Sequence, residues 1–80
     1  MKIRFYGKLA DLFGSEREMA IDAPCTVAEL RHRLAIERPE GAESLQHKRV
    51  RACIDDEIAH DHDIVAKDTV LEFLAPVSGG

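Results

Sequence analysis

Alternating apolar and polar residues predict the strands of this chain. Ile3 and Phe5 fall on one face of an extended segment at residues 2–6, and a similar apolar alternation recurs at residues 69–74. Because these two segments are the most apolar of the extended ones, we expect them at the centre of a sheet. Further strands are expected at residues 18–21 and 50–54, with a short return strand at residues 58–60 after a polar turn.

One main helix is predicted to begin after Thr26. Thr26 and Glu29 have the spacing of a capping box, and the apolar residues that follow at helical spacing are Val27, Leu30 and Leu34. We expect Pro39 and Gly41 to end this helix, and residues 38–48 to form a polar loop anchored by Leu45. The spacing of Leu9, Leu12 and Phe13 predicts a short helical turn that ends at Gly14.

The succession of these elements predicts an α+β fold. Its order is strand, strand, helix, strand, short strand and strand, which favours a mixed sheet with one main helix packed across it. Eighty residues, 45% of them apolar, are enough for one domain at residues 1–80 with a small core. No internal repeat or linker divides the chain.

The last strand predicts a contrast between its two faces. Leu71 and Phe73 should point at the helix, whereas Val70, Glu72 and Leu74 should point away from it. An exposed Leu74 next to the C-terminus is typical of a docking contact. It is equally compatible with an isolated surface leucine, which needs no functional explanation.

The chain ends in two glycines, and this end is the strongest indication of function. Residues 75–80 are expected to form a flexible tail, because glycine is costly to order and small enough for close approach to another protein. From Pro76 onward such a tail could extend ~16 Å. The α-carboxylate of Gly80 is therefore the candidate reactive group, and a tail of this length could enter a narrow channel in a partner.

Composition excludes several other classes of function. With 15 acidic and 11 basic residues the formal charge is −4, and the longest basic run is residues 48–51, which argues against nucleic-acid binding. An acidic chain suits docking on basic partner surfaces. No apolar run approaches the ~20 residues that span a membrane. The first residues lack the apolar stretch of a secretory signal, so a cytoplasmic protein is expected.

Two polar or reactive groups are better explained by structure than by chemistry. Cys25 and Cys53 form no C-x-x-C pair, so packing as small apolar residues is favoured over a role as persulfide relay thiols. Residues 60–63, His-Asp-His-Asp, contain metal-ligand types, but adjacent loop residues cannot easily converge on one ion. A solvated turn is favoured, and no metal site is predicted.

Several segments carry a resemblance to a known family. They are Ile3-Arg4-Phe5-Tyr6-Gly7, Leu9-Ala10-Asp11-Leu12-Phe13-Gly14, Thr26-Val27-Ala28-Glu29-Leu30, Ala52-Cys53-Ile54-Asp55-Asp56 and Glu72-Phe73-Leu74-Ala75-Pro76-Val77-Ser78-Gly79-Gly80. With this order of elements the chain resembles the β-grasp, ubiquitin-like sulfur carriers, and among them the small subunits of molybdopterin synthase. Leu74 and Ala75 stand where that family commonly has an aromatic residue and a proline, which makes the apolar contact smaller.

The resemblance implies a mechanism centred on Gly80, with Gly79 as the slim neighbour that permits entry into a partner. A ubiquitin-activating-like adenylyltransferase would use ATP and Mg²⁺ to adenylate Gly80, and a persulfide donor would convert it to a thiocarboxylate. The tail would then enter the large subunit of molybdopterin synthase, in a heterotetramer, and donate sulfur to cyclic pyranopterin monophosphate. The chain itself would bind no cofactor. The resemblance assigns partner contacts to Leu74, Ile58, Pro76, Val77 and Ser78.

Two alternatives remain open at this point. A sister carrier would use the same terminal chemistry to supply sulfur for the thiamin thiazole or for tRNA thiolation, although Pro76-Val77-Ser78 favours the molybdopterin branch. A ubiquitin-like binding module would not need the two glycines, and a protein modifier would use them to form isopeptide bonds with lysines.

Overall fold

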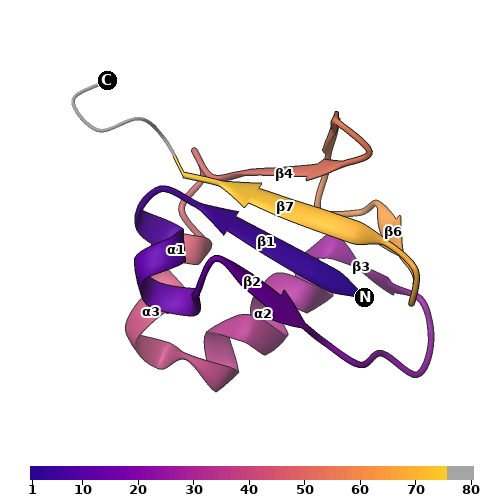
Figure 1. Cartoon of the computed structure of the whole chain (residues 1–80), viewed down its shortest axis with the longest axis horizontal. Coiled ribbons are helices and arrows are strands. Elements are labelled where there is room, and N and C mark those ends of the chain that lie inside the picture. The colour runs from indigo at the N-terminus through magenta and orange to yellow at the C-terminus, as the bar shows by residue number, and fades with distance from the viewer. Residues whose placement is uncertain (76–80) are drawn as a thin grey trace.

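The computed structural model of the chain describes residues 1–75, and residues 76–80 lie outside the described part (Figure 1). None of the helices in residues 1–75 is long and apolar enough to cross a membrane. The elements in chain order are β1 Lys2–Tyr6, α1 Lys8–Phe13, β2 Glu16–Glu18, β3 Cys25–Thr26, α2 Val27–Glu37, α3 Pro39–Leu45, β4 Arg51–Ile54, β5 Glu57–Ala59, β6 Ile64–Val65 and β7 Val70–Leu74.

The main sheet has β7 at its centre. The strand order is β2-β1-β7-β4-β5, with β1 and β7 parallel and the other neighbours antiparallel. The expected central position of the first and last strands is confirmed. Figure 1 shows the three helices gathered on one side of this sheet, so the other side is left without a helix from residues 1–75.

The helix side of the sheet holds the hydrophobic core. Leu71 and Phe73 of β7 are fully buried, as the alternation predicted. The Phe5 ring stacks on the rings of Phe13 and Phe73, with centroid separations of 5.0 and 5.8 Å. Burial of several large side chains at 1.5–3 kcal/mol each, as is typical, supplies much of the stability of so small a fold.

The predicted capping box begins α2. The Thr26 hydroxyl accepts a hydrogen bond from the Glu29 amide, and the Glu29 carboxylate accepts one from the Thr26 amide, both at 3.1 Å. The next two amides, those of Val27 and Ala28, donate to the carbonyls of Asp63 and Asp61. The N-terminal N–H groups of this helix, which have no partners within it, are thereby satisfied.

The prediction of a polar loop at residues 38–48 is wrong, because residues 39–45 form α3. Pro39 does follow the end of α2, but it occupies the first turn of α3, where a missing N–H is tolerated. Gly41 lies buried inside α3 instead of ending α2. A Cβ at Gly41 would lie 2.6 Å from the Phe13 ring, so glycine is what lets α3 pack against α1. Leu45 is buried, as expected.

The second strand also differs from its predicted position. It spans Glu16–Glu18 instead of residues 18–21. The antiparallel pairing with β1 begins at Glu16, opposite Arg4, and Met19 follows the strand, where its amide donates to the Met1 carbonyl. The hairpin at residues 50–60 is confirmed as β4 and β5. Asp55 and Asp56 turn it with φ of 52° and 67°, the positive values that a tight two-residue hairpin requires.

Candidate functional site

The side of the sheet opposite the helices is a candidate contact surface. We call it the open face, and its residues are Arg4, Tyr6, Arg51, Cys53, Ile58, Val70, Glu72 and Leu74. Leu74 is 37% exposed, Tyr6 42% and Ile58 62%. Most large apolar side chains of so small a domain are needed in its core, so their gathering on one exposed surface is a sign of binding.

Strand register fixes how these residues neighbour one another. Leu74 lies between Tyr6 on β1 and Arg51 on β4, at the end of β7 that leads into the C-terminal segment. Cys53 lies between Glu72 on β7 and Ile58 on β5 in the adjacent row. Leu74 and Ile58, both predicted to bind a partner, therefore share a face but are separated by β4.

Tyr6 and Glu72 are joined by a hydrogen bond on the open face. The Tyr6 hydroxyl donates to Glu72 Oε2 at 2.6 Å. This bond, followed by desolvation, raises the pKa of Tyr6, because losing the proton would leave two negative groups side by side. The phenol therefore stays neutral, and its ring is held beside Leu74 as an apolar contact with a polar edge.

Gly7 lies next to the start of the C-terminal segment. Gly7 adopts φ of 64° and ψ of −139°, a conformation that essentially only glycine occupies. A Cβ at Gly7 would lie 3.6 Å from the Ala75 Cβ. Ala75, which the sequence analysis assigned to the flexible tail, is half-buried and packs against the core.

The remaining predicted site residues lie beyond the described part of the chain. They are Pro76, Val77, Ser78, Gly79 and Gly80. The described part of the chain ends at Ala75, one residue after Leu74, the last residue of the central strand β7.

The two cysteines lie in different environments. Cys25 is buried, and Cys53 is half-buried on the open face. Burial, followed by the charges of Glu72 and Asp56, raises the pKa of the Cys53 thiol. Because the thiolate is the nucleophile, this environment makes Cys53 a poor sulfur relay and supports the packing interpretation.

The His-Asp-His-Asp segment has a structural role. Asp63 Oδ2 accepts a hydrogen bond from the His60 amide at 2.7 Å, and the carbonyls of Asp61 and Asp63 receive the first amides of α2. Among residues 1–75 no group of three or more His, Cys, Asp and Glu side chains could hold a metal ion.

Tyr6 and Arg51 belong to the open face but were not singled out from the sequence. Each lies on a strand whose alternation was recognised, and each is one position away from a residue of the core face. Strand alternation alone could therefore have placed them opposite the helices. Their position beside Leu74 depends on the order of the strands, which alternation does not specify.

Together, the mixed sheet, the parallel pairing of its first and last strands and the helices on one side define a β-grasp, ubiquitin-like fold. The chain belongs to the ThiS family, whose model matches residues 3–80. It is therefore a member of a family of β-grasp sulfur carriers and ubiquitin-like modifiers.

Solved structures of two archaeal proteins are similar to this chain. SAMP1 from Haloferax volcanii has a TM-score of 0.79 at 22% identity, with 99% of this chain and 97% of that chain covered. The putative molybdopterin converting factor, subunit 1, from Pyrococcus furiosus has a TM-score of 0.79 at 14% identity, with 95% of each chain covered. At these identities the likeness shows the fold alone. No curated protein sequence matches the chain.

Proposed function

We propose that this chain is the sulfur carrier subunit of a molybdopterin synthase. The observation that carries the proposal is the family match, which extends over residues 3–80 and so includes the Gly79-Gly80 end. A structurally similar protein is titled a putative molybdopterin converting factor subunit. The Pro76-Val77-Ser78 sequence before the glycines is typical of that branch.

The chemistry would take place at the Gly80 carboxylate. A carboxylate is a poor electrophile, so an adenylyltransferase would first join it to AMP from ATP, with Mg²⁺ and release of pyrophosphate. The terminal sulfur of a persulfide donor would then displace AMP and form an acyl disulfide. A thiol would cleave the S–S bond, leaving a thiocarboxylate on Gly80 and a disulfide on the donor. In the large synthase subunit this sulfur would pass to cyclic pyranopterin monophosphate. Gly79 would allow the slender end to enter that site.

The folded domain would contribute recognition and the starting point of the tail. Leu74, Tyr6 and Ile58 offer exposed apolar surface, and Arg51 adds a cation beside Leu74 that makes no ion pair with a residue in the described range. Burial of such residues by a partner is the usual source of binding energy. The adenylyltransferase and the large subunit would both dock here, with Pro76, Val77 and Ser78 extending the contact.

Reconstitution tests this proposal. The purified chain is incubated with an adenylyltransferase of this family, ATP, Mg²⁺ and a persulfide donor, and its intact mass is measured. The expected product has one oxygen replaced by sulfur, and a chain that lacks Gly79-Gly80 should stay unchanged. An unaltered mass in a reaction that modifies a known carrier would contradict the proposal.

The acceptor is tested separately. We expect the chain to restore molybdopterin formation in a strain that lacks its own small synthase subunit. Restoration of only thiamin thiazole synthesis or only tRNA thiolation would assign the same terminal chemistry to a sister carrier.

A second candidate function is covalent protein modification. Two structurally similar chains are SAMP1 and small archaeal modifier protein 1, both from H. volcanii, the latter with a TM-score of 0.76 at 19% identity and 95% of each chain covered. Modification would use the same Gly80 adenylate, but a lysine amine would attack its acyl carbon, forming an isopeptide bond and releasing AMP. Isopeptide-linked conjugates in cells that express a tagged chain would favour this function over sulfur transfer.

A further inference from the structure

Two adjoining pockets lie beside Arg31, and the smaller one extends to Arg51 and Ile58 of the open face. The larger has a volume of about 250 Å³ and is also lined by Ala28, Gln46 and His47. The smaller has a volume of about 160 Å³ and includes Arg51 and His60 in its lining. Arg31, Lys48, Val50 and Asp61 line both, and we call this pair the Arg31 pockets.

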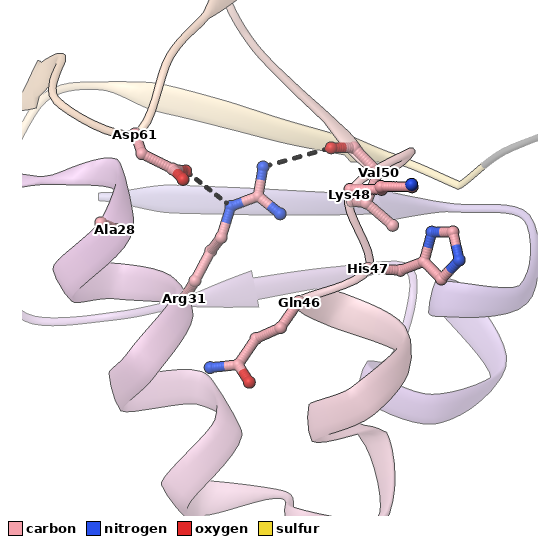
Figure 2. A pocket seen from close by; sticks show the side chains of 7 residues that line it. All are labelled: Ala28, Arg31, Gln46, His47, Lys48, Val50 and Asp61. Carbon is pink, nitrogen blue, oxygen red and sulfur yellow. Dashed lines mark hydrogen bonds and ion pairs between the residues drawn. The ribbon is translucent and has the colours of Figure 1, made fainter.

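The Arg31 guanidinium is fixed in place between the two pockets. Its Nη1 donates to the Leu45 carbonyl at 2.9 Å, and its Nη2 donates to the Val50 carbonyl at 3.2 Å. Its central carbon lies 5.2 Å from the centroid of the Phe73 ring, a favourable cation–π position. A cation held by α2, the end of α3 and the start of β4 needs little reorganisation to meet a ligand. Figure 2 shows it between Asp61 and the segment that contains Val50.

Arg31 still has hydrogen-bond donors to offer. Its Nε lies 3.2 Å from Asp61 Oδ1, yet the buried Nε–H makes no hydrogen bond with any residue of the described part. Each terminal nitrogen also carries a second N–H beyond the one already used. A buried donor without an acceptor is costly, so an oxyanion that accepted these N–H groups would relieve the cost.

Positive charge exceeds negative charge around these pockets. Arg31, Lys48 and Arg51 line them, against one carboxylate, Asp61. Within residues 1–75, neither Lys48 nor Arg51 takes part in an ion pair, and both are exposed. In a chain whose formal charge is −4, this local excess marks a place that attracts anions.

The backbone amides at the start of α2 are not part of this site. Those of Val27 and Ala28 already donate to the carbonyls of Asp63 and Asp61. Recognition must therefore come from side chains, and Arg31 supplies the planar set of N–H groups that suits phosphate and carboxylate oxygens.

We propose that the Arg31 pockets bind a small oxyanion, a phosphate or carboxylate group. Arg31 donates to it through Nε and its remaining terminal N–H groups, and the flexible Lys48 side chain closes over it with a second positive charge. When the site is empty, Arg31 is paired with Asp61, whose carboxylate is largely exposed. A ligand therefore has to compete with this carboxylate for Arg31. The proposal does not use the sulfur chemistry proposed for Gly80, although the smaller pocket shares Arg51 and Ile58 with the open face.

The test is a titration of the full ¹⁵N-labelled chain, followed by NMR at constant ionic strength. Inorganic phosphate and a hexaglutamate peptide are the two probes, and sodium chloride is the reference anion. We expect saturable shifts at the Arg31 side-chain Nε–H and the amides of residues 47–51. Tighter binding of phosphate would identify a free anion as the ligand, and tighter binding of the peptide would identify carboxylates of a protein.

Three variants make the test specific. Lys48→Gln should weaken binding about tenfold, the size of one charge-assisted hydrogen bond. Asp61→Asn should tighten it about three- to tenfold, because the competing carboxylate is removed. Lys67→Gln removes the same charge from an exposed turn outside the pockets and should change nothing. The proposal is overturned if neither probe gives saturable shifts beyond those of chloride, or if Lys48→Gln binds as tightly as the unaltered chain.

Discussion

Phe73 and Leu74 are adjacent in β7, yet they belong to two different surfaces of the molecule. Phe73 is fully buried, stacked on Phe5 and covered by the Arg31 guanidinium. Leu74 is 37% exposed on the open face between Tyr6 and Arg51. One strand therefore serves both the core and the surface through its period of two.

The difference between these faces separates folding from recognition. The helix side is filled by the chain's own apolar residues, so a substitution there should lower the free energy of unfolding. The open face has apolar side chains that no helix of residues 1–75 covers (Figure 1). Substitutions on the open face should leave the fold intact and weaken only the binding of a partner.

The most severe test of this separation compares two alanine substitutions. Phe73→Ala should lower the free energy of unfolding by about 3–5 kcal/mol, because it removes a buried ring and leaves a cavity. Leu74→Ala should lower it by less than about 1 kcal/mol, because the side chain is partly in water. Urea denaturation of the two variants checks this. Equal losses would show that the open face is part of the core.

A substitution at Gly41 tests how tightly the helix side is packed. Alanine in a helix normally stabilises by about 1 kcal/mol relative to glycine. Here its Cβ would meet the Phe13 ring at 2.6 Å, so we expect Gly41→Ala to destabilise by about 1–3 kcal/mol instead. Glu43→Ala, at an exposed position of the same helix, is the control and should be almost neutral. A stabilised Gly41→Ala chain would contradict the close packing of α1 and α3.

Partner binding should show the opposite pattern. The double variant Leu74→Ala, Ile58→Ala is expected to weaken binding to the large synthase subunit about 10- to 100-fold, the effect of one or two central contacts. Ile36→Ala is a matched control, because Ile36 is 65% exposed and Ile58 62%, but Ile36 lies on α2. Calorimetry measures both affinities. If the control loses as much affinity as the double variant, the docking surface lies on the helices.

The smallest effect concerns the edge of the open face. Lys2, followed by Arg4, lowers the pKa of Glu16 below its ordinary value of 4.5. The pairing therefore stabilises the fold above about pH 4.5, and that contribution is lost as the pH falls through the lower pKa of the folded state. The melting temperature of Glu16→Gln should differ slightly from that of the unaltered chain at pH 7, and the two should converge in acid once Glu16 is protonated in the folded state as well. A difference in melting temperature that persists in acid would refute the ion-pair explanation.

The sequence predicted the faces of β1 and β7 and the start of α2, because these rest on local rules. Alternation identifies buried residues such as Phe73, and the Thr26–Glu29 pair satisfies amides within three residues. The prediction failed at α3, since its apolar residues are few and Gly41 signals a helix end unless the neighbouring Phe13 is known. It also missed the Arg31 pockets, whose residues come from three parts of the chain: α2, residues 46–52 and residues 58–61.

The candidate site was predicted only in part for the same reason. Leu74 and Ile58 could be singled out one at a time, but their common face depends on β4 lying between β7 and β5. Arg51 and Tyr6 join them only through that strand order. Gly79 and Gly80 were recognised because the chemistry of a free carboxylate needs no tertiary structure.

The most direct test of the account is to locate the sulfur. After reaction with the adenylyltransferase, ATP and a persulfide donor, tandem mass spectrometry of the C-terminal peptide should show one oxygen replaced by sulfur at Gly80. A Cys53→Ser chain should be loaded equally well. Sulfur found instead as a persulfide on Cys53 or Cys25, with an unaltered Gly80, would contradict the account.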